Sequence, residues 1–145
     1  GKDKSCCIRQ LTQLFHTGEI WGIEAEMLEN EFSGSHGGKC SIIPSVKFEQ
    51  VFVETMENYL RFARETLQLE NPYRFRAGVT EVRGFRMATA GRGGQGFRGH
   101  IFDNEIVYEG KIDDPTVSSR LILIPFFNHL WESCGLKRPD KEVLD

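Results

Sequence analysis

The sequence predicts an α+β domain in which a small antiparallel sheet packs against a long central helix and a C-terminal helix. Three patterns predict this fold class. Apolar residues recur every three or four positions over 45–70, alternate with polar residues over 73–79, and return to helical spacing over 117–134. With 145 residues, the chain has the length of one domain. We therefore expect a single α+β domain over 1–145, with a polar tail over 136–145.

The composition is that of a soluble protein, with 39% hydrophobic and 27% charged residues. No apolar run reaches the ~18–20 residues that a membrane-spanning helix needs, so no membrane partner is expected. The chain opens with Gly1 rather than Met. We interpret it as a segment excised from a longer protein.

The cysteines favour a reduced, cytoplasmic protein. None of the four forms a C-x-x-C pair, so the spacing of a zinc finger is absent from Cys6, Cys7, Cys40 and Cys134. Reduced thiols are typical of the cytosol. A redox or metal-binding pair at Cys6 and Cys7 is the alternative, although a disulfide between neighbours strains the intervening peptide.

The N-terminal part is expected to contain one helix and two strands. Apolar residues spaced near 3.6 over 6–15 predict a short helix that ends at Gly18. Alternation over 19–28 then predicts a strand whose half-buried face carries Trp21, Ile23, Ala25 and Met27. The Gly- and Ser-rich segment 29–39 predicts a loop, and 40–43 predict a short strand.

The central helix is predicted to begin at Ser45, a suitable N-cap, and to end at Asn71–Pro72, because the residue before a proline avoids the helical region. Its apolar stripe is formed by Phe48, Phe52, Met56, Tyr59, Ala63 and Leu67. Charged residues such as Glu49 and Arg61 are assigned to the other side. We interpret the stripe as core, and a cofactor groove is the alternative.

The next segment predicts a β-hairpin. Apolar and basic residues alternate from Tyr73 to Val79, which indicates a strand with one apolar and one basic face. Arg83–Gly84 predicts the reversal, and the alternation continues on a return strand through Phe85, Met87 and Thr89.

A glycine-rich stretch, GRGGQGFRG over 91–99, contains the bare G-x-G-x-x-G spacing of a dinucleotide site. That motif has to open a helix, whereas the residues after it favour strand, with a short strand at 105–109. We therefore predict a flexible loop between two strands and no bound cofactor.

The last helix is predicted over 117–134, with Asp113 and Asp114 before Pro115 as its start. Pro125 lies inside this helix and predicts a kink or a restart. Gly135 is a natural residue to follow its C-terminus. The polar tail beyond it is expected to fray.

No constellation of residues indicates catalysis, so no enzyme activity, metal or cofactor is expected. The four histidines lack the helical spacing to an acid or another histidine that a metal face needs, and no nucleophile elbow is present. Glu24 and Glu26 share a strand face and could serve acid–base chemistry or bind a cation, but solvated strand charges are the favoured interpretation.

The charge is uneven along a chain with a net charge of −3. Residues 73–100 carry six arginines against Glu81 alone: Arg74, Arg76, Arg83, Arg86, Arg92 and Arg98. Guanidinium groups and exposed aromatic rings can hold phosphates and stack bases, so these six are the candidate nucleic-acid-binding residues. We favour the alternative that they pair with acidic residues of the same domain.

Three segments, FHTGEIWGIEAEM, NPYRFRAGVTEVRGFRM and IPFFNHLWESCGL, give the chain a family resemblance. Over about 15–136 it resembles the C-terminal region of bacterial ATP-binding regulators that carry an AlbA-type (Schlafen-like) DNA-binding domain at the N-terminus. The shared features are the Pro after the long helix, the turn at Val82-Arg83-Gly84, and the Pro…Leu-Trp…Gly pattern of the last helix. The resemblance implies the tail domain of such a protein, with the ATP-binding and helix-turn-helix residues upstream.

We therefore expect a non-catalytic interaction or assembly domain of a cytoplasmic bacterial regulator. The expected partner is a protein or a second copy of the chain. The alternative is an accessory nucleic-acid-binding module that uses the arginine-rich segment 73–100.

Overall fold

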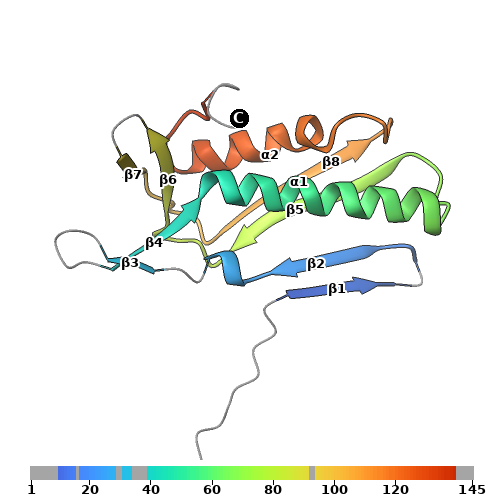
Figure 1. Ribbon diagram of the computed structural model, residues 1–145, viewed down its shortest axis with the longest axis horizontal. Coiled ribbons are helices and arrows are strands. Elements are labelled where there is room, and N and C mark those ends of the chain that lie inside the picture. The colour runs from blue at the N-terminus through green and yellow to red at the C-terminus, as the bar shows by residue number, and fades with distance from the viewer. Residues whose placement is uncertain (1–9, 16, 29–30, 34–38, 92–93, 140–145) are drawn as a thin grey trace, which may run out of the picture.

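The computed structural model describes residues 10–15, 17–28, 31–33, 39–91 and 94–139, and it confirms the α+β class (Figure 1). In chain order the elements are β1 (Gln10–Leu14), β2 (Ile20–Glu24), β3 (Glu31–Ser33), β4 (Lys39–Pro44), α1 (Ser45–Arg61), β5 (Tyr73–Thr80), β6 (Arg86–Gly91), β7 (Gly94–Arg98), β8 (Glu105–Ile112) and α2 (Ser119–Ser133). A 3₁₀ turn, η1 (Glu26–Leu28), follows β2, and a π-helical turn, η2 (Phe62–Thr66), extends α1.

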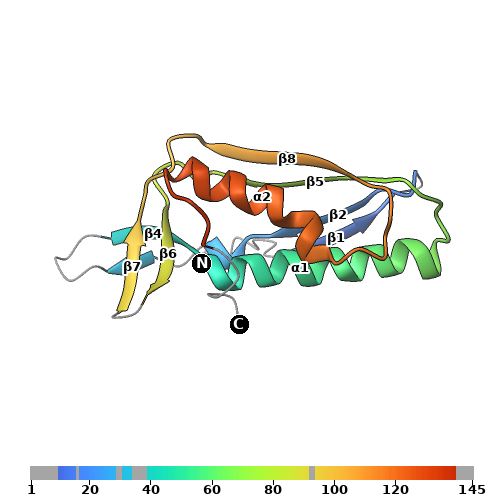
Figure 2. The same cartoon turned by 90° about the horizontal axis from the view of Figure 1, so that it is seen from above.

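The core lies between the two helices and the β5–β8 ribbon. Figure 2 shows α1 and α2 on the same side of this ribbon. Phe48 and Phe52 of α1 contact Phe126 and Phe127 of α2, with the Phe52 and Phe126 ring centroids 5.0 Å apart. Phe48, Phe126 and Phe127 are almost completely buried. The aromatic stripe of the central helix is therefore used largely to bind the second helix.

The predicted strand over 73–79 is β5, and its alternation is as expected. Tyr73, Phe75, Ala77 and Val79 are buried or half-buried, and the residues between them are exposed. The predicted hairpin is wrong, however, because β5 pairs antiparallel with β8 and not with the segment after Arg83–Gly84. β8 has a matching row of inward-facing side chains that includes the buried Ile106 and Ile112. The segment directly after β5 leaves the ribbon and does not pair with it.

The segment after the turn joins a different sheet, with the order β3-β4-β6-β7. β6 pairs parallel with β4 and antiparallel with β7. The expectation of a loop over 91–99 is wrong for 94–98, which form β7 and pair with β6. Glycine lowers the intrinsic preference for strand but does not forbid one. Here the backbone hydrogen bonds of the ladder to β6 stabilise the strand despite its two glycines. Residues 92–93 lie outside the described part.

The predicted N-terminal helix is also wrong over 10–14, which form β1 and pair with β2. Residues 6–9, and with them Cys6 and Cys7, lie outside the described residues. The strand predicted over 19–28 is confirmed only for 20–24, because the chain turns into η1 at Glu26. The strand predicted at 40–43 is β4, and β3 forms a short strand within the segment 29–39 that was expected to be a loop.

The helix ends differ from expectation in their capping. Ser45 lies inside α1 rather than at its N-cap, and its hydroxyl donates to the Ala88 carbonyl at 2.7 Å. α2 begins at Ser119, two residues later than expected. Asp114 belongs to a separate turn, in which it accepts hydrogen bonds from the backbone N–H and the hydroxyl of Thr116. These bonds stabilise the carboxylate and lower the pKa of Asp114.

The C-terminus of α2 follows the prediction. Gly135 has φ of +75° and donates its N–H to the Glu132 carbonyl at 2.8 Å, while Leu136 donates to Trp131 at 3.0 Å. This is the usual way in which a left-handed glycine closes a helix. Pro125 lies within α2. Within the predicted polar tail, Arg138 is hydrogen-bonded to Glu49 of α1. Residues 140–145 lie outside the described part.

Candidate functional site

One face of the β1–β2 hairpin contacts α1 through Tyr59. Thr12 and Gly22 are directly opposite each other in the ladder. The hydroxyls of Thr12 and Tyr59 are hydrogen-bonded at 3.2 Å, and a Cβ at Gly22 would lie only 2.1 Å from the Tyr59 oxygen. The absence of a side chain at Gly22 therefore leaves room for the Tyr59 hydroxyl in its present position.

The outer face of the hairpin is apolar and exposed. Because side chains alternate along a strand, the residues that share this face are Leu11, Gln13, Phe15, Trp21 and Ile23. Trp21 is 57% exposed and Ile23 is 52% exposed. The Phe15 and Trp21 rings are in edge contact, with their centroids 6.0 Å apart. We call these residues the hairpin face.

The hairpin face corrects the sequence interpretation of β2. Trp21 and Ile23 were expected on the half-buried side of this strand, and they are the exposed side. The opposite side carries Ile20, which is half-buried, and Gly22, which lies next to the Tyr59 side chain of α1. A two-stranded sheet has marginal stability by itself, so a hairpin with one apolar face left in water is a candidate docking surface.

The structure separates the six arginines that the sequence singled out. Arg74 and Arg76 are exposed on β5, on the side of the β5–β8 ribbon away from the helices. Arg76 forms an ion pair with Glu109, which is directly opposite it in the ladder. Arg86 does not lie on a strand next to these two, because β8 occupies that place.

The other arginines belong to the β6–β7 region. Arg83 is exposed in the turn before β6, Arg86 begins β6, and Arg98 ends β7. Arg92 lies outside the described residues. At a rise of about 3.3 Å per residue, Arg76 is about 13 Å from the end of β5, and Arg83 lies beyond that end. The arginines therefore form two groups rather than one surface.

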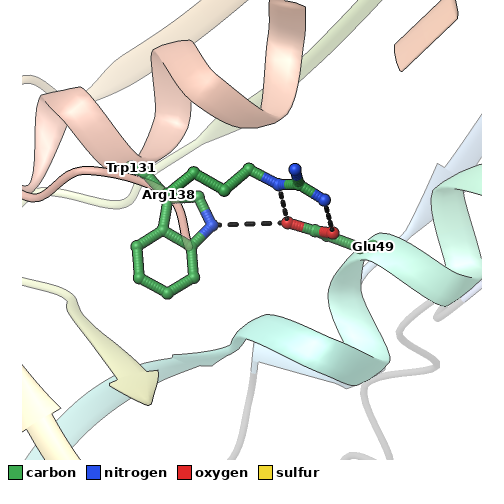
Figure 3. Close-up of polar contacts among 3 residues, drawn as sticks. All are labelled: Glu49, Trp131 and Arg138. Atoms are coloured by element: carbon green, nitrogen blue, oxygen red, sulfur yellow. Dashed lines mark hydrogen bonds and ion pairs between the residues drawn. The ribbon is translucent and has the colours of Figure 1, made fainter. Parts of the chain in front are cut away.

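A buried polar cluster connects α1 with the segment after α2 (Figure 3). Glu49 is 2% exposed. Its Oε1 accepts hydrogen bonds from Arg138 Nε at 2.8 Å and from Trp131 Nε1 at 3.3 Å, and its Oε2 accepts one from Arg138 Nη2 at 2.7 Å. The Arg138 guanidinium also lies over the Phe127 ring. With its carboxylate occupied in this way, Glu49 holds the C-terminal segment onto α1.

Sequence reasoning placed Glu49 on the solvated side of the helix and so missed this cluster. The available signal was its spacing. Glu49 lies one turn from Val53, which is buried, and four residues after Ser45, which is also buried. A carboxylate within an apolar stripe indicates a buried partner, although the identity of that partner could not be read from the spacing.

Glu24, one of the two acidic residues considered for acid–base chemistry or cation binding, has a structural role. Glu24 Oε1 accepts hydrogen bonds from the backbone N–H groups of Glu26 at 2.7 Å and Met27 at 3.2 Å. Glu24 thus caps the η1 turn, as acidic side chains do at the start of a helix. Among the residues that the structure describes, no group of three or more His, Cys, Asp or Glu could hold a metal ion.

A depression of about 350 Å³ lies between the helices and is lined by Val46, Gln50, Val53, Glu54 and Arg120. It mixes apolar and charged groups without a convergent set of acid, base or nucleophile. In the described part of the chain, neither helix has the length and apolar character needed to cross a bilayer. A comparison with protein-family models, curated proteins and solved structures found no match to this chain.

Proposed function

We propose that this chain is a non-catalytic assembly domain that pairs with a second copy of itself through the hairpin face. The observation that carries the proposal is the exposure of Leu11, Phe15, Trp21 and Ile23 on one side of a two-stranded sheet. Contiguous apolar patches of this kind mark interaction sites on soluble proteins. Tryptophan is also among the residues that contribute most to binding at interfaces.

A second copy suits the charge of this surface. Of the charged residues described in the hairpin, Glu19 lies at the turn between β1 and β2, and Glu24 lies on the opposite face, where it caps the η1 turn. If two hairpins stack face to face with their turns at opposite ends, the two Glu19 carboxylates are separated by about the length of the hairpin, roughly 17 Å. The apolar rows then meet without a like-charge contact, as in the packing of two sheets.

Such stacking would also complete the layer structure around the hairpin. The inner face already rests on Tyr59 of α1. Covering the outer face would give this sheet a second packing partner, and an isolated two-stranded sheet is at best marginally stable. That the assembly serves a cytoplasmic bacterial ATP-binding regulator is a further part of the proposal, and it rests on the sequence resemblance alone.

The test is the molar mass in solution, measured by light scattering over a hundredfold range of protein concentration at low and high salt. We expect a dimer that persists at high salt, because apolar contacts are not screened. The double variant Trp21→Ser with Ile23→Ser should be monomeric with an unchanged far-UV spectrum. The matched control is Leu121→Ser on α2, which removes another exposed apolar side chain and should remain dimeric.

Two outcomes would contradict the proposal. One is a wild-type chain that stays monomeric at every concentration. The other is a double variant that remains as dimeric as the Leu121→Ser control, which would show that the interface lies elsewhere.

A further inference from the structure

Residues 82–91 and 94–102 form one antiparallel unit that is longer than β6 and β7 alone. Below the β6–β7 ladder, Gly84 donates its N–H to the Ile101 carbonyl at 2.7 Å, and Ile101 donates to the Phe85 carbonyl at 3.0 Å. Ile101 is completely buried, so the base of the hairpin is anchored in the core. We call this unit the basic hairpin, and it is described except for residues 92–93.

The basic hairpin has a charge unlike that of the rest of the chain. It contains four arginines and no acidic residue, whereas the whole chain has a net charge of −3, so the remainder carries −7. Arg83, Arg86 and Arg98 are exposed, and none of them forms an ion pair with any residue in the described part. Arg76 and Arg138, by contrast, are paired with glutamates. Among the described residues, no carboxylate neutralises these three guanidinium groups.

An aromatic ring lies at the base of the same hairpin. Phe102 is 75% exposed, more than any other exposed large apolar side chain in the described residues. Its ring contacts that of His100 edge to face, with the centroids 4.8 Å apart. Because Ile101 is hydrogen-bonded and buried next to it, Phe102 is presented to solvent from a fixed backbone.

We propose that the basic hairpin binds single-stranded nucleic acid. Phe102 would stack on an unpaired base, and Arg83 and Arg98 would contact phosphates along the strand; Arg86 lies on the other face of the ladder from Arg98, which is opposite Met87. An exposed ring beside guanidinium groups that lack an ion-pair partner among the described residues is the combination that single-strand binders use, and it does not depend on base sequence. A duplex keeps its bases stacked on each other, so it cannot use Phe102 in this way.

Acidic residues limit where the strand can lie. Three acidic residues flank the base of the hairpin: Glu81 precedes it after β5, and Asp103 and Glu105 follow it, with Glu105 at the start of β8. They would repel phosphates that extend toward the β5–β8 ribbon. The strand is therefore expected to run from Phe102 toward β6 and β7, and away from Arg74 and the paired Arg76.

This inference stands on different residues from the proposed dimer, and each can fail without the other. The probe is a short fluorescein-labelled oligouridylate or oligothymidylate, titrated with protein and followed by fluorescence anisotropy at two salt concentrations. Each protein is first checked by circular dichroism. The wild type should bind, and its affinity should fall as salt rises.

Two variants test the two parts of the site. Loss of one base stack in Phe102→Ala should weaken binding about 5- to 150-fold. The pair Arg83→Ala with Arg98→Ala should weaken binding and reduce the slope of log affinity against log salt by about 1.4 for a single strand. The matched controls are Phe62→Ala, which removes another exposed ring, and Arg74→Ala with Arg76→Ala, which removes two exposed arginines outside the hairpin. Both controls should leave the affinity within about twofold of wild type.

Four results would overturn the proposal. They are the absence of any anisotropy change at low salt, equal competition by a duplex of the same length, unchanged affinity in Phe102→Ala, and an equal loss in the Arg74 and Arg76 control. The last would show that binding follows overall charge rather than this hairpin.

Discussion

Arg138 forms a bidentate ion pair with Glu49, although the two residues are 89 positions apart in the sequence. Glu49 belongs to α1 and Arg138 to the segment that follows α2. The Glu49 side chain is 3% exposed and that of Arg138 is 11% exposed, so the pair is nearly free of solvent. The contact fixes the C-terminal segment against the helix pair that forms the core.

Removing one partner of this ion pair should destabilise the domain strongly. In Arg138→Ala, the Glu49 carboxylate remains buried and keeps only the hydrogen bond from Trp131 among its described partners. Uncompensated buried charges of this kind cost about 3–5 kcal/mol. The measurement is the free energy of unfolding in urea, followed by circular dichroism.

The neighbouring Lys137, which is exposed, provides the control, and Lys137→Ala should change the stability by less than about 0.5 kcal/mol. The double variant Glu49→Leu with Arg138→Leu should be more stable than Arg138→Ala, because it leaves no buried charge. If Arg138→Ala costs no more than Lys137→Ala, the ion pair does not hold the segment in solution.

Substitution of Gly99 should be much more costly than substitution of Gly135, although both have a positive φ. Gly99 has φ of +70°, and an added Cβ would lie 2.3 Å from the backbone carbonyl oxygen of Cys134. Gly135 has φ of +75° with open space around the same position. We expect Gly135→Ala to cost about 1–2 kcal/mol from conformation alone, and Gly99→Ala to cost more because the α2 C-terminus must also move.

The measurement is again urea unfolding, with both alanine variants compared with wild type. Equal losses in the two variants would mean that the base of the basic hairpin and the end of α2 are not held in the close contact described.

The Cys134 thiol should be unreactive in the folded protein. Cys134 is 4% exposed, and burial raises its pKa to about 11 because the thiolate would lose its hydration. The ordinary value is 9.0, so the folded state retains the proton between about pH 9 and 11 while the unfolded state loses it. The contribution of this thiol to stability is therefore constant below pH 9 and falls as the pH rises toward 11.

A variant with Cys6, Cys7 and Cys40 all changed to Ser isolates this thiol. At pH 8, a chromogenic disulfide reagent should react with it only after denaturant is added. Reaction with the native protein at the rate of a free thiol would contradict the burial of Cys134.

Gly22 and Tyr59 should show strong energetic coupling. In Gly22→Ala the new methyl group overlaps the Tyr59 hydroxyl, and the hairpin or the ring has to shift, at a cost of about 1–3 kcal/mol. In Tyr59→Phe the hydroxyl is gone, and the nearest remaining ring atom lies 3.0 Å from the Cβ position. The double variant should therefore recover part of the stability that Gly22→Ala loses, even though Tyr59→Phe also removes the hydrogen bond to Thr12.

The check is a double-mutant cycle on the free energy of unfolding. Additive losses from the two single variants would show that the inner face of the hairpin does not rest on Tyr59.

The candidate surfaces were only partly accessible to sequence reasoning. Alternation correctly indicates that Trp21 and Ile23 share a face of one strand, but it does not say whether that face is covered. The sequence assigned it to the interior because apolar residues are usually buried. Phe102 follows a stretch with no regular period, so nothing in the pattern indicated its exposure.

What the sequence determined by itself was local: the amphipathic helix from Ser45, the strand with Phe75 and Val79 turned inward, the glycine after α2 and the α+β class. Each of these depends on side-chain periodicity or on the conformational limits of one residue. Only the tertiary structure decided that β5 pairs with β8, that residues 10–14 form a strand, and that Glu49 is paired with Arg138. Strand partners and buried ion pairs are contacts between distant segments, and a periodic pattern specifies the face that must be covered without specifying which segment covers it.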